Sequence, residues 1–372
     1  MLIYILLIVY ILILPYIVSP FVRGDNVKIQ KYTALFGMIA VFLLLALKAP
    51  SVGVDIKGYE QQYYLSRRIP WNDFSYVYYE NGYILFEKIF SKLGLSFQFF
   101  TAFIYFLECL SVYLIISKYS TDSRFSILFF VCYQFLVFST SGLRQTIAVS
   151  LCTFAFLLFY KQKLLPSIFG LLLTAAAYTV HSSALIFFVI PVIILLNRYF
   201  SVISLSELFI GVVLSLFIRS TLWSFINNYF RKIESDGGFS LSGNFIFLLC
   251  IALFCLFTYQ MYYRTGLFGR RTLYTGTETV TREPNDTFLV RASICIVLMH
   301  IMLSGGVLLR GLMCLNMMLV AFLPNMINKY RFKQKAAIKA VFMTALILIF
   351  YFQTLSVNQL GICPYKFFWE GV

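Results

Sequence analysis

Long apolar runs separated by short polar connections dominate the sequence. Twelve such runs hold between 13 and 20 residues each, close to the roughly 20 residues that one helical pass through a bilayer requires. We therefore predict an all-α polytopic membrane protein with about twelve transmembrane helices. The predicted helices are Met1–Val18, Tyr32–Leu47, Phe99–Ser117, Phe125–Phe138, Thr146–Tyr160, Leu164–Tyr178, Ala184–Leu196, Leu208–Trp223, Asn244–Tyr262, Thr287–Leu303, Leu308–Ile327 and Ala336–Leu355.

A hairpin of two apolar runs, Thr146–Tyr160 and Leu164–Tyr178, stands out among them. Each run has 15 residues, and three polar residues from Lys161 join them. Two opposed passes return the chain to its starting side, so we expect Arg144 and His181 to lie at the same membrane face. A guanidinium group at the end of a membrane helix is costly unless it faces protein, water or an anion. This makes the face with Arg144 and His181 the first place to look for chemistry.

The composition supports the membrane class. Hydrophobic residues make up 60% of the chain and charged residues 12%, about half the charged fraction of a soluble domain. No soluble domain, coiled coil or low-complexity tract interrupts residues 1–372, and we predict a single integral membrane domain. The eight cysteines are scattered without a CxxC pair, which indicates apolar packing rather than disulfides or a metal site.

The distribution of basic residues predicts the orientation. Lysine and arginine accumulate in the segments that we assign to the cytoplasm, as the positive-inside rule requires, and both chain ends then lie outside. Residues 48–98 form a long external loop, rich in tyrosine, that we expect to contain short helices lying against the membrane. The net charge of +15 fits cytoplasmic loops near anionic lipid or an anionic substrate.

Two arginines in the external connections are candidates for binding a diphosphate. Arg144 stands between Gly142 and Gln145, and Arg310 follows two glycines. Arginine holds phosphate through a planar fork and stays charged at any working pH. The alternative is an arginine that only extends to the membrane interface.

One histidine and two carboxylates on the same face are candidates for acid–base chemistry. His181 is a side chain of the type that exchanges protons near neutral pH, although it could equally be a buried hydrogen-bonding partner. Asp55 and Glu80 could deprotonate a hydroxyl, orient His181 or pair with Arg67 or Arg68. The other histidine, His300, lies within an apolar run and is interpreted as structural. No phosphate-binding loop or dinucleotide motif is present, which favours a donor that is already activated over a nucleotide.

Several short motifs together resemble the EpsG branch of the Wzy-type polysaccharide polymerases, over about Val52 to Pro324. In the penultimate stretch, Gly311 to Asn316 depart from the aromatic-rich pattern of that family. The motifs that carry the resemblance are Gly53-Val-Asp55 with Tyr59, Glu80-Asn-Gly-Tyr83, Gly142-Leu-Arg-Gln145, Ala177-Tyr-Thr-Val-His-Ser182 and the late Arg310 before a helix that ends in Pro324.

The resemblance implies a GT-C-like glycosyltransferase in the bacterial cytoplasmic membrane, with its active site on the external, periplasmic side. Such enzymes polymerise O-antigen or capsule repeat units carried on undecaprenyl diphosphate, and they use no cofactor, metal or nucleic acid. Donor and acceptor are both lipid-linked oligosaccharides, and a chain-length regulator protein is a further expected partner. The implied roles are diphosphate binding by Arg144, Arg310 and Gln145, catalysis by His181, Asp55 and Glu80, and sugar binding by Tyr59, Tyr83, Arg67 and Arg68.

Two other functions fit the same residues. A flippase for lipid-linked sugars would line a cavity with basic side chains, but such transporters often show internal repeats, and this chain shows none that is convincing. A ligase would move the same glycan from the same donor to a different acceptor.

Overall fold

The computed structural model describes the chain except for residues 200–204, 230–241, 264–283, 304–306, 359 and 371–372. The described residues form helices joined by turns and loops, with one isolated antiparallel bridge between Lys48 and Phe367. They divide into two compact units, Met1–Leu185 with Phe332–Val372, and Ile186–Arg331. The all-α prediction is confirmed, whereas this division does not test the prediction of a single membrane domain.

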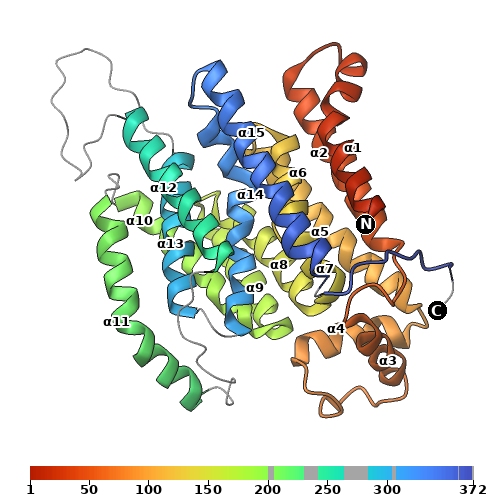
Figure 1. Ribbon diagram of the computed structural model, residues 1–372. Helices are drawn as coiled ribbons and strands as arrows, with labels where there is room; N and C mark the ends of the chain where they lie inside the picture. Colours follow the sequence, from red (N-terminus) through yellow and green to blue (C-terminus); the bar gives the residue numbers. More distant parts are fainter. Residues whose placement is uncertain (200–204, 230–241, 264–283, 304–306, 359, 371–372) are drawn as a thin grey trace, which may run out of the picture. The chain divides into compact units, whose positions relative to one another are not determined.

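The first unit contains the predicted hairpin and the long loop (Figure 1). Its helices are α1 (Leu2–Val18), η1 (Ser19–Val22), α2 (Asn26–Ala46), α3 (Ile56–Ser66), α4 (Asn81–Lys92), α5 (Phe97–Tyr119), α6 (Ser123–Cys132), α7 (Phe135–Ser141), α8 (Leu143–Phe159), α9 (Leu164–Val180), α15 (Phe332–Ile349) and the π-helical η4 (Phe350–Ser356).

The second unit contains most of the remaining helices. They are α10 (Val189–Tyr199), α11 (Leu205–Tyr229), α12 (Gly243–Tyr263), α13 (Pro284–Leu303), η3 (Val307–Leu312) and α14 (Met313–Ile327). The 3₁₀ segment η2 (Ser182–Phe188) connects the two units. His300 is buried in α13 against the ring of Phe245, which agrees with a structural role.

Seven helices in the described part of the chain are long and apolar enough to cross a membrane. The count is eight if the bent pair α6 and α7 is one span. Helices α8 and α9 have 17 residues each, about 26 Å at 1.5 Å per residue, somewhat less than the roughly 30 Å hydrocarbon core. All twelve predicted segments are helical for most of their length, but twelve crossings stay a prediction.

The predicted helix Phe125–Phe138 is wrong as a continuous element. The chain bends by 48° between α6 and α7, where Gln134 adopts the left-handed conformation with φ of 62°. Left-handed backbone is unfavourable for a residue with a Cβ, and no glycine or proline marks the position. The hydroxyl of Ser139, on α7, donates to the buried Glu108 carboxylate of α5 at 2.6 Å, which holds the bent segment against the core.

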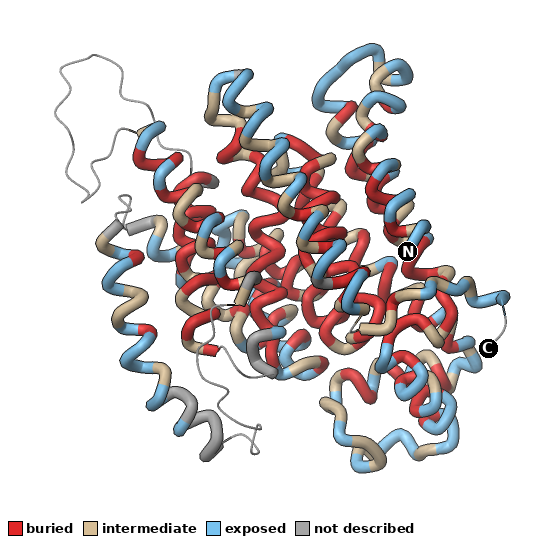
Figure 2. Tube along the Cα trace, in the orientation of Figure 1, coloured by how far each residue is buried: buried red, intermediate tan, exposed pale blue. Residues whose placement is uncertain are grey.

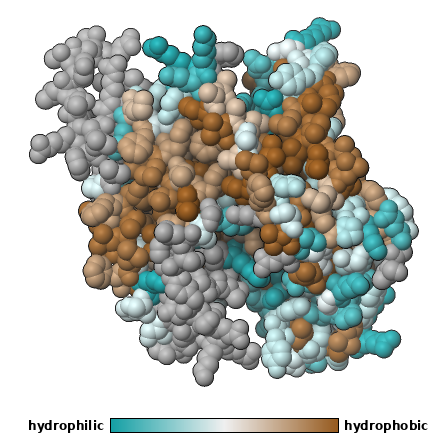
Figure 3. Space-filling view, viewed as in Figure 1, coloured by the Kyte–Doolittle hydropathy of each residue, from teal (hydrophilic) through white to brown (hydrophobic). Residues whose placement is uncertain are grey.

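The core of the first unit lies along α5 to α8, where buried residues gather (Figure 2). Gly170 lets α9 approach α8 closely, because a Cβ there would lie 2.8 Å from the Phe159 ring. Figure 3 shows hydrophobic side chains over α1 and α2 and hydrophilic ones over α3 and α4. All eight cysteines are free, and Cys109, Cys132, Cys152, Cys255 and Cys314 are buried.

Residues 48–98 contain two short helices, α3 and α4, as the sequence indicates. Their position outside the membrane stays a prediction. The C-terminal tail lies at the same end of the first unit. The Ala49 N–H donates to the Lys366 carbonyl at 2.8 Å, and the Tyr4 hydroxyl donates to the Ile362 carbonyl at 3.0 Å.

Candidate functional site

Arg144 lies in the first turn of α8. The helix begins at Leu143, three residues earlier than the predicted Thr146, so that Arg144 belongs to the helix rather than to the connection before it. Gly142 links α7 to α8: its N–H donates to the Phe138 carbonyl at 2.6 Å, and its own carbonyl accepts from Thr146 at 2.9 Å. The position of the guanidinium group is therefore set by a helix terminus.

Glu80 is the N-cap residue of α4. Its backbone is extended, with φ of −67° and ψ of 141°, and its side chain makes no capping hydrogen bond with the helix. Two residues later, Gly82 lies against Thr179 of α9: a Cβ at Gly82 would be 2.6 Å from the Thr179 carbonyl oxygen. This close approach brings the start of α4 beside the end of α9, where His181 is the C-cap residue.

The carboxylate of Glu80 joins Arg144 to His181. One oxygen, Oε2, accepts from Nη1 of Arg144 at 2.5 Å. The other, Oε1, lies 3.1 Å from Nδ1 of His181 and also accepts the N–H of Ser182 at 3.1 Å. The predicted proximity of Arg144 and His181 is confirmed, and the side chain that links them was predicted only as one of several possible partners.

These contacts keep Glu80 ionised. Burial raises the pKa of the carboxyl, but the hydrogen bond with His181, the charge of Arg144 and the Ser182 N–H outweigh it and lower the pKa to about 2. The side chains of Arg144, Glu80 and His181 remain 22%, 23% and 15% exposed. The cluster is thus ordered by the protein and still open to a ligand.

Tyrosines from α3 and from the segment before α4 pack around Arg144. The Tyr59 hydroxyl accepts from Nε at 3.3 Å, and the guanidinium carbon lies 4.0 Å from the centre of the Tyr79 ring. The rings of Tyr59, Tyr79 and Tyr83 contact one another at 5.5 to 5.7 Å. Stacking on a planar guanidinium and a hydrogen bond to it fix its orientation.

Asp55 contacts α7 rather than His181 in the described structure. The Ser141 hydroxyl donates to its carboxylate at 2.9 Å, and the Asp55 N–H lies 3.3 Å from the same hydroxyl oxygen. Gly53, with φ of 103°, packs so closely on the Thr140 carbonyl that a Cβ would lie 2.1 Å from it. These contacts fix the start of α3 to the turn that precedes Arg144.

A family model described as the EpsG family matches residues 31–367, nearly the whole chain. The chain belongs to the EpsG family. No curated protein and no solved structure matches the chain significantly. Membership confirms the resemblance and suggests a function of the membrane polysaccharide polymerase type.

The remaining residues that the EpsG resemblance singled out lie in several places. Tyr59 and Tyr83 are 5% and 0% exposed, so that their rings pack within the protein instead of presenting a free face to a sugar. Gln145 is buried in α8. Arg310 lies in η3 of the second unit, at an exposed position, whereas the cluster around Glu80 belongs to the first.

Arg67 and Arg68 are both exposed at the end of α3. Arg67 donates to the Leu95 carbonyl at 2.5 Å, and its guanidinium carbon lies 5.2 Å from the centre of the Tyr64 ring. The alternative in which either arginine pairs with Glu80 is wrong, because Glu80 pairs with Arg144.

Sequence reasoning missed three contributors to the cluster in this EpsG-family chain. Tyr79, directly before Glu80, stacks on Arg144; Ser182, directly after His181, donates to Glu80; and Ser141 binds Asp55. Each is adjacent or close in sequence to a residue already singled out. Their positions beside candidate residues were the available indication in the sequence, which does not specify the side chains that they contact.

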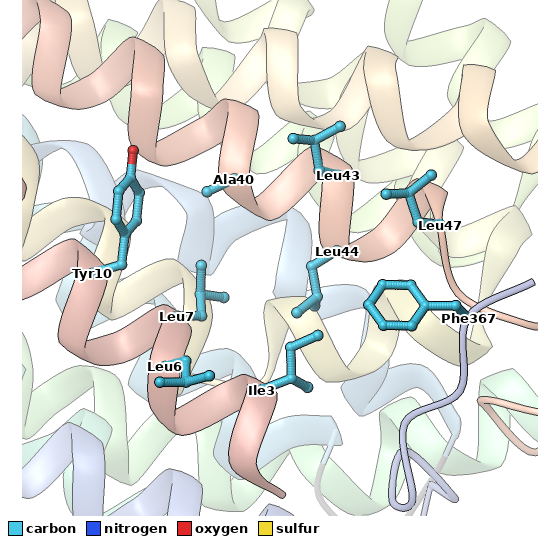
Figure 4. Close-up of a pocket in the computed structure, with 9 residues that line it drawn as sticks. All are labelled: Ile3, Leu6, Leu7, Tyr10, Ala40, Leu43, Leu44, Leu47 and Phe367. Atoms are coloured by element: carbon cyan, nitrogen blue, oxygen red, sulfur yellow. The ribbon is translucent and has the colours of Figure 1, made fainter.

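Two grooves in the described part of the first unit lie away from this cluster. One groove of about 320 Å³ runs between α1 and α2. Figure 4 shows its apolar lining, including Ile3, Leu7 and Leu44, with Phe367 of the C-terminal tail at one end. A groove without charged groups between two membrane helices suits lipid chains and offers nothing to a diphosphate.

Proposed function

We propose that this protein polymerises oligosaccharide repeat units that are carried on undecaprenyl diphosphate. The observation that carries the proposal is the Glu80 carboxylate shared by Arg144 and His181. A cation for the leaving group and a base for the incoming hydroxyl are the two functions that this transfer needs. Membership of the EpsG family supports the same reaction class.

In the proposed reaction, a sugar hydroxyl of the acceptor attacks the anomeric carbon of the donor glycan. The new glycosidic bond forms as the bond from that carbon to the diphosphate oxygen breaks. Electrons of the broken bond pass to the lipid diphosphate, and the hydroxyl proton passes to a base. The growing chain leaves its carrier and is joined to the next lipid-linked unit.

His181 is the proposed base. If Nδ1 of the imidazole carries the hydrogen that faces Glu80, then Nε2 has the free lone pair that accepts a proton. A carboxylate on the other ring nitrogen fixes the tautomer and stabilises the imidazolium that forms. Glu80, which is ionised throughout the working pH range, is therefore assigned as a positioning residue. Asp55, bound to Ser141, is assigned to the support of α7.

Arg144 is the proposed diphosphate ligand. Tyr59 and Glu80 use two of its five N–H groups, and the others can bind phosphate oxygens. The N-terminus of α8 has no side-chain cap, and the positive end of a helix dipole favours an anion there. Positive charge fixed where negative charge develops lowers the barrier of the transfer. We also propose that Gln145 and Arg310 take part in binding the diphosphate.

The remaining parts of the proposal concern location and partners. We place the site on the external side of the bacterial cytoplasmic membrane, in a twelve-helix chain that acts without a metal or cofactor. Arg67 and Arg68, exposed on α3, are assigned to sugar binding, while Tyr59 and Tyr83 act through their packing around Arg144. A chain-length regulator protein is the expected partner in the membrane.

The test uses purified full-length protein in lipid nanodiscs with a synthetic undecaprenyl-diphosphate-linked repeat unit. We expect a ladder of lengthened glycans from the unchanged protein, no ladder from Arg144→Ala, and a normal ladder from the control Arg23→Ala, which removes an exposed arginine next to α2. A normal ladder from Arg144→Ala would overturn the assigned role. Transfer of the glycan only to a different acceptor would identify a ligase, and transport without lengthening would identify a flippase.

A further inference from the structure

Helix α4 buries Tyr83 and Ile84 in its first turn, but beyond them it buries polar side chains and exposes apolar ones, the reverse of a helix in water. Its buried side includes Glu87, Lys88 and Ser91, each at most 1% exposed. Its outward side carries Leu85, Ile89 and Leu93, which are 45%, 40% and 70% exposed. A helix on the surface of a soluble protein buries its apolar stripe and exposes its charges. The arrangement in α4 indicates an apolar environment on its outer side.

Contacts on the buried side fix the rotation of α4. The Lys88 ammonium group donates to the carbonyls of Pro70 at 2.6 Å and of Asp73, and it lies 4.8 Å from the centre of the Phe74 ring. These acceptors replace the water that the charge loses on burial. A rotation of α4 that turned Leu85, Ile89 and Leu93 inward would break these contacts of Lys88.

Two further contacts also fix the rotation of α4. Glu87 accepts from the Gln62 amide at 3.1 Å, and the hydroxyls of Ser66 and Ser91 lie 2.6 Å apart. Both pairs connect α4 to α3 and hold the outward stripe of α4 in its orientation.

The stripe continues onto a helix that is long enough to span the bilayer. After α4 the chain turns at Gly94, which has φ of 78°, and enters α5. The rings of Phe90 on α4 and Phe99 on α5 lie 6.4 Å apart. Phe99 and Phe106 are 51% and 47% exposed on α5, where a membrane-spanning helix faces lipid.

Basic side chains lie at the end of α4 that is farther from Glu80. Lys92 is in the last turn, its amine 5.4 Å from the centre of the exposed Trp71 ring. Arg67 and Arg68 end the neighbouring α3. Tryptophan, lysine and arginine beside an apolar face are typical of helices at the lipid head groups.

We propose that α4 lies in the membrane interface, with Leu85, Ile89 and Leu93 among the lipid chains of one leaflet and Lys92 at the head-group phosphates. Because Glu80 caps this helix, the immersion sets the depth of the Glu80, Arg144 and His181 cluster at the level where a lipid diphosphate resides. The partner of this surface is the bilayer itself. The proposal requires only a membrane protein and is independent of the polymerase reaction.

The test measures the depth of single tryptophans in the full-length protein. The natural tryptophans are replaced in a W71F, W223F, W369F background, and a reporter is introduced by Ile89→Trp or, as control, by Gln61→Trp on the exposed side of α3. Each protein is reconstituted into phosphatidylcholine vesicles with and without brominated acyl chains. We expect at least twofold quenching by bromolipid for I89W, with blue-shifted emission, and little quenching for Q61W.

Four results would overturn the proposal. Red-shifted, unquenched emission from I89W would place the stripe in water. Blue-shifted emission without bromolipid quenching would mean that protein covers the stripe. Equal quenching of Q61W would mean that the quenching does not distinguish the outward stripe of α4 from the exposed side of α3. Quenching of I89W that disappears on adding a polyprenyl diphosphate would assign the stripe to that carrier.

A second comparison keeps the inference testable if the tryptophan-free background does not fold. Ile89→Asp and Gln61→Asp, in the otherwise unchanged chain, are compared by thermal unfolding in nanodiscs and in detergent. We expect I89D alone to lower the midpoint, and to lower it in both media. Equal midpoints for I89D and Q61D in nanodiscs would count against immersion.

Discussion

The Cα of Gly82 lies against the carbonyl group of Thr179, so closely that a Cβ on Gly82 would be 2.6 Å from the carbonyl oxygen and 2.3 Å from the threonine hydroxyl. The carbonyl belongs to the last turn of α9 and cannot move without disturbing the helix end. This contact controls how near Glu80, two residues before Gly82, comes to His181, two residues after Thr179. Glycine is required here by space, since its φ is not in the left-handed region.

Gly82→Ala should therefore separate the start of α4 from the end of α9. Overpacking of this kind costs about 1–3 kcal/mol, and we expect a lower unfolding midpoint together with a loss of polymer of at least tenfold. Gly58→Ala is the matched control, because nothing lies within 4 Å of its added Cβ. Equal activity of the two variants would show that the contact does not matter for the site.

Glu80→Gln keeps the size of the side chain and removes its charge. The amide cannot hold both Arg144 and His181 as the carboxylate does, and loss of a residue that orients a functional imidazole typically costs about 10- to 100-fold in activity. We expect such a decrease in kcat with a folded protein. The pH–rate profile provides a second reading: because the pKa of Glu80 is lowered to about 2, the unchanged protein should show no Glu80 ionisation above pH 4. A break there that Glu80→Gln removes would contradict the assignment.

Arg144→Lys tests whether charge alone is sufficient. Lysine retains the positive charge but loses the planar fork, the contact on the Tyr79 ring and the Nε bond to Tyr59. We expect kcat to fall roughly 10²- to 10³-fold, the range seen when one donor of a charge-stabilising site is removed, with a smaller effect on the KM for donor. Steady-state kinetics with the synthetic donor measure both constants, and near-normal kcat would show that the guanidinium geometry is dispensable.

The buried Glu87 should make stability depend on pH. Burial raises the pKa of its carboxyl to about 7, against the hydrogen bonds from Tyr76 and Gln62, from an ordinary value of 4.5. The folded chain then holds a proton between pH 4.5 and 7 that the unfolded chain releases, so stability should fall as pH rises through this window. At about 1.4 kcal/mol per pKa unit, the effect is on the order of 3 kcal/mol at most.

Glu87→Gln should abolish most of that slope. Thermal unfolding in nanodiscs between pH 5 and pH 7 compares the variant with the unchanged chain. Glu80 does not interfere, because its lowered pKa places its contribution below about pH 4.5. An identical slope in the two proteins would mean that Glu87 is not the responsible group.

Hydrophobic pattern was sufficient to predict the helical class and the pairing of α8 with α9. Two apolar runs of equal length joined by three polar residues can return only to the same side, and this placed Arg144 near His181. The pattern could not reveal the bend at Gln134, because the residues from Phe125 to Phe138 are apolar almost throughout and contain no glycine or proline. Bends of this kind are decided by tertiary contacts such as the bond from Ser139 to Glu108.

The sequence could not reveal the partners of Glu80 either. Glu80 lies 64 residues from Arg144 and 101 from His181, and no periodicity connects positions so far apart. Among the nearer basic residues, Arg67 and Arg68 were the obvious alternatives. The choice of Arg144 depends on the space that Gly82 leaves at Thr179, a property that becomes visible only when the helices are placed together.

The hydrogen bonds between the C-terminal tail and the first residues of the chain bear on the number of times that the chain crosses the bilayer. Tyr4 is tied to Ile362, and Ala49 to Lys366, which puts the beginning of α1 and residues 362–366 at one end of the first unit. A polypeptide whose ends share a compartment makes an even number of passes. We therefore predict an even number of passes between Tyr4 and Ile362, a condition that eight and twelve both satisfy. Reporter enzymes fused to the two ends should be active in the same compartment.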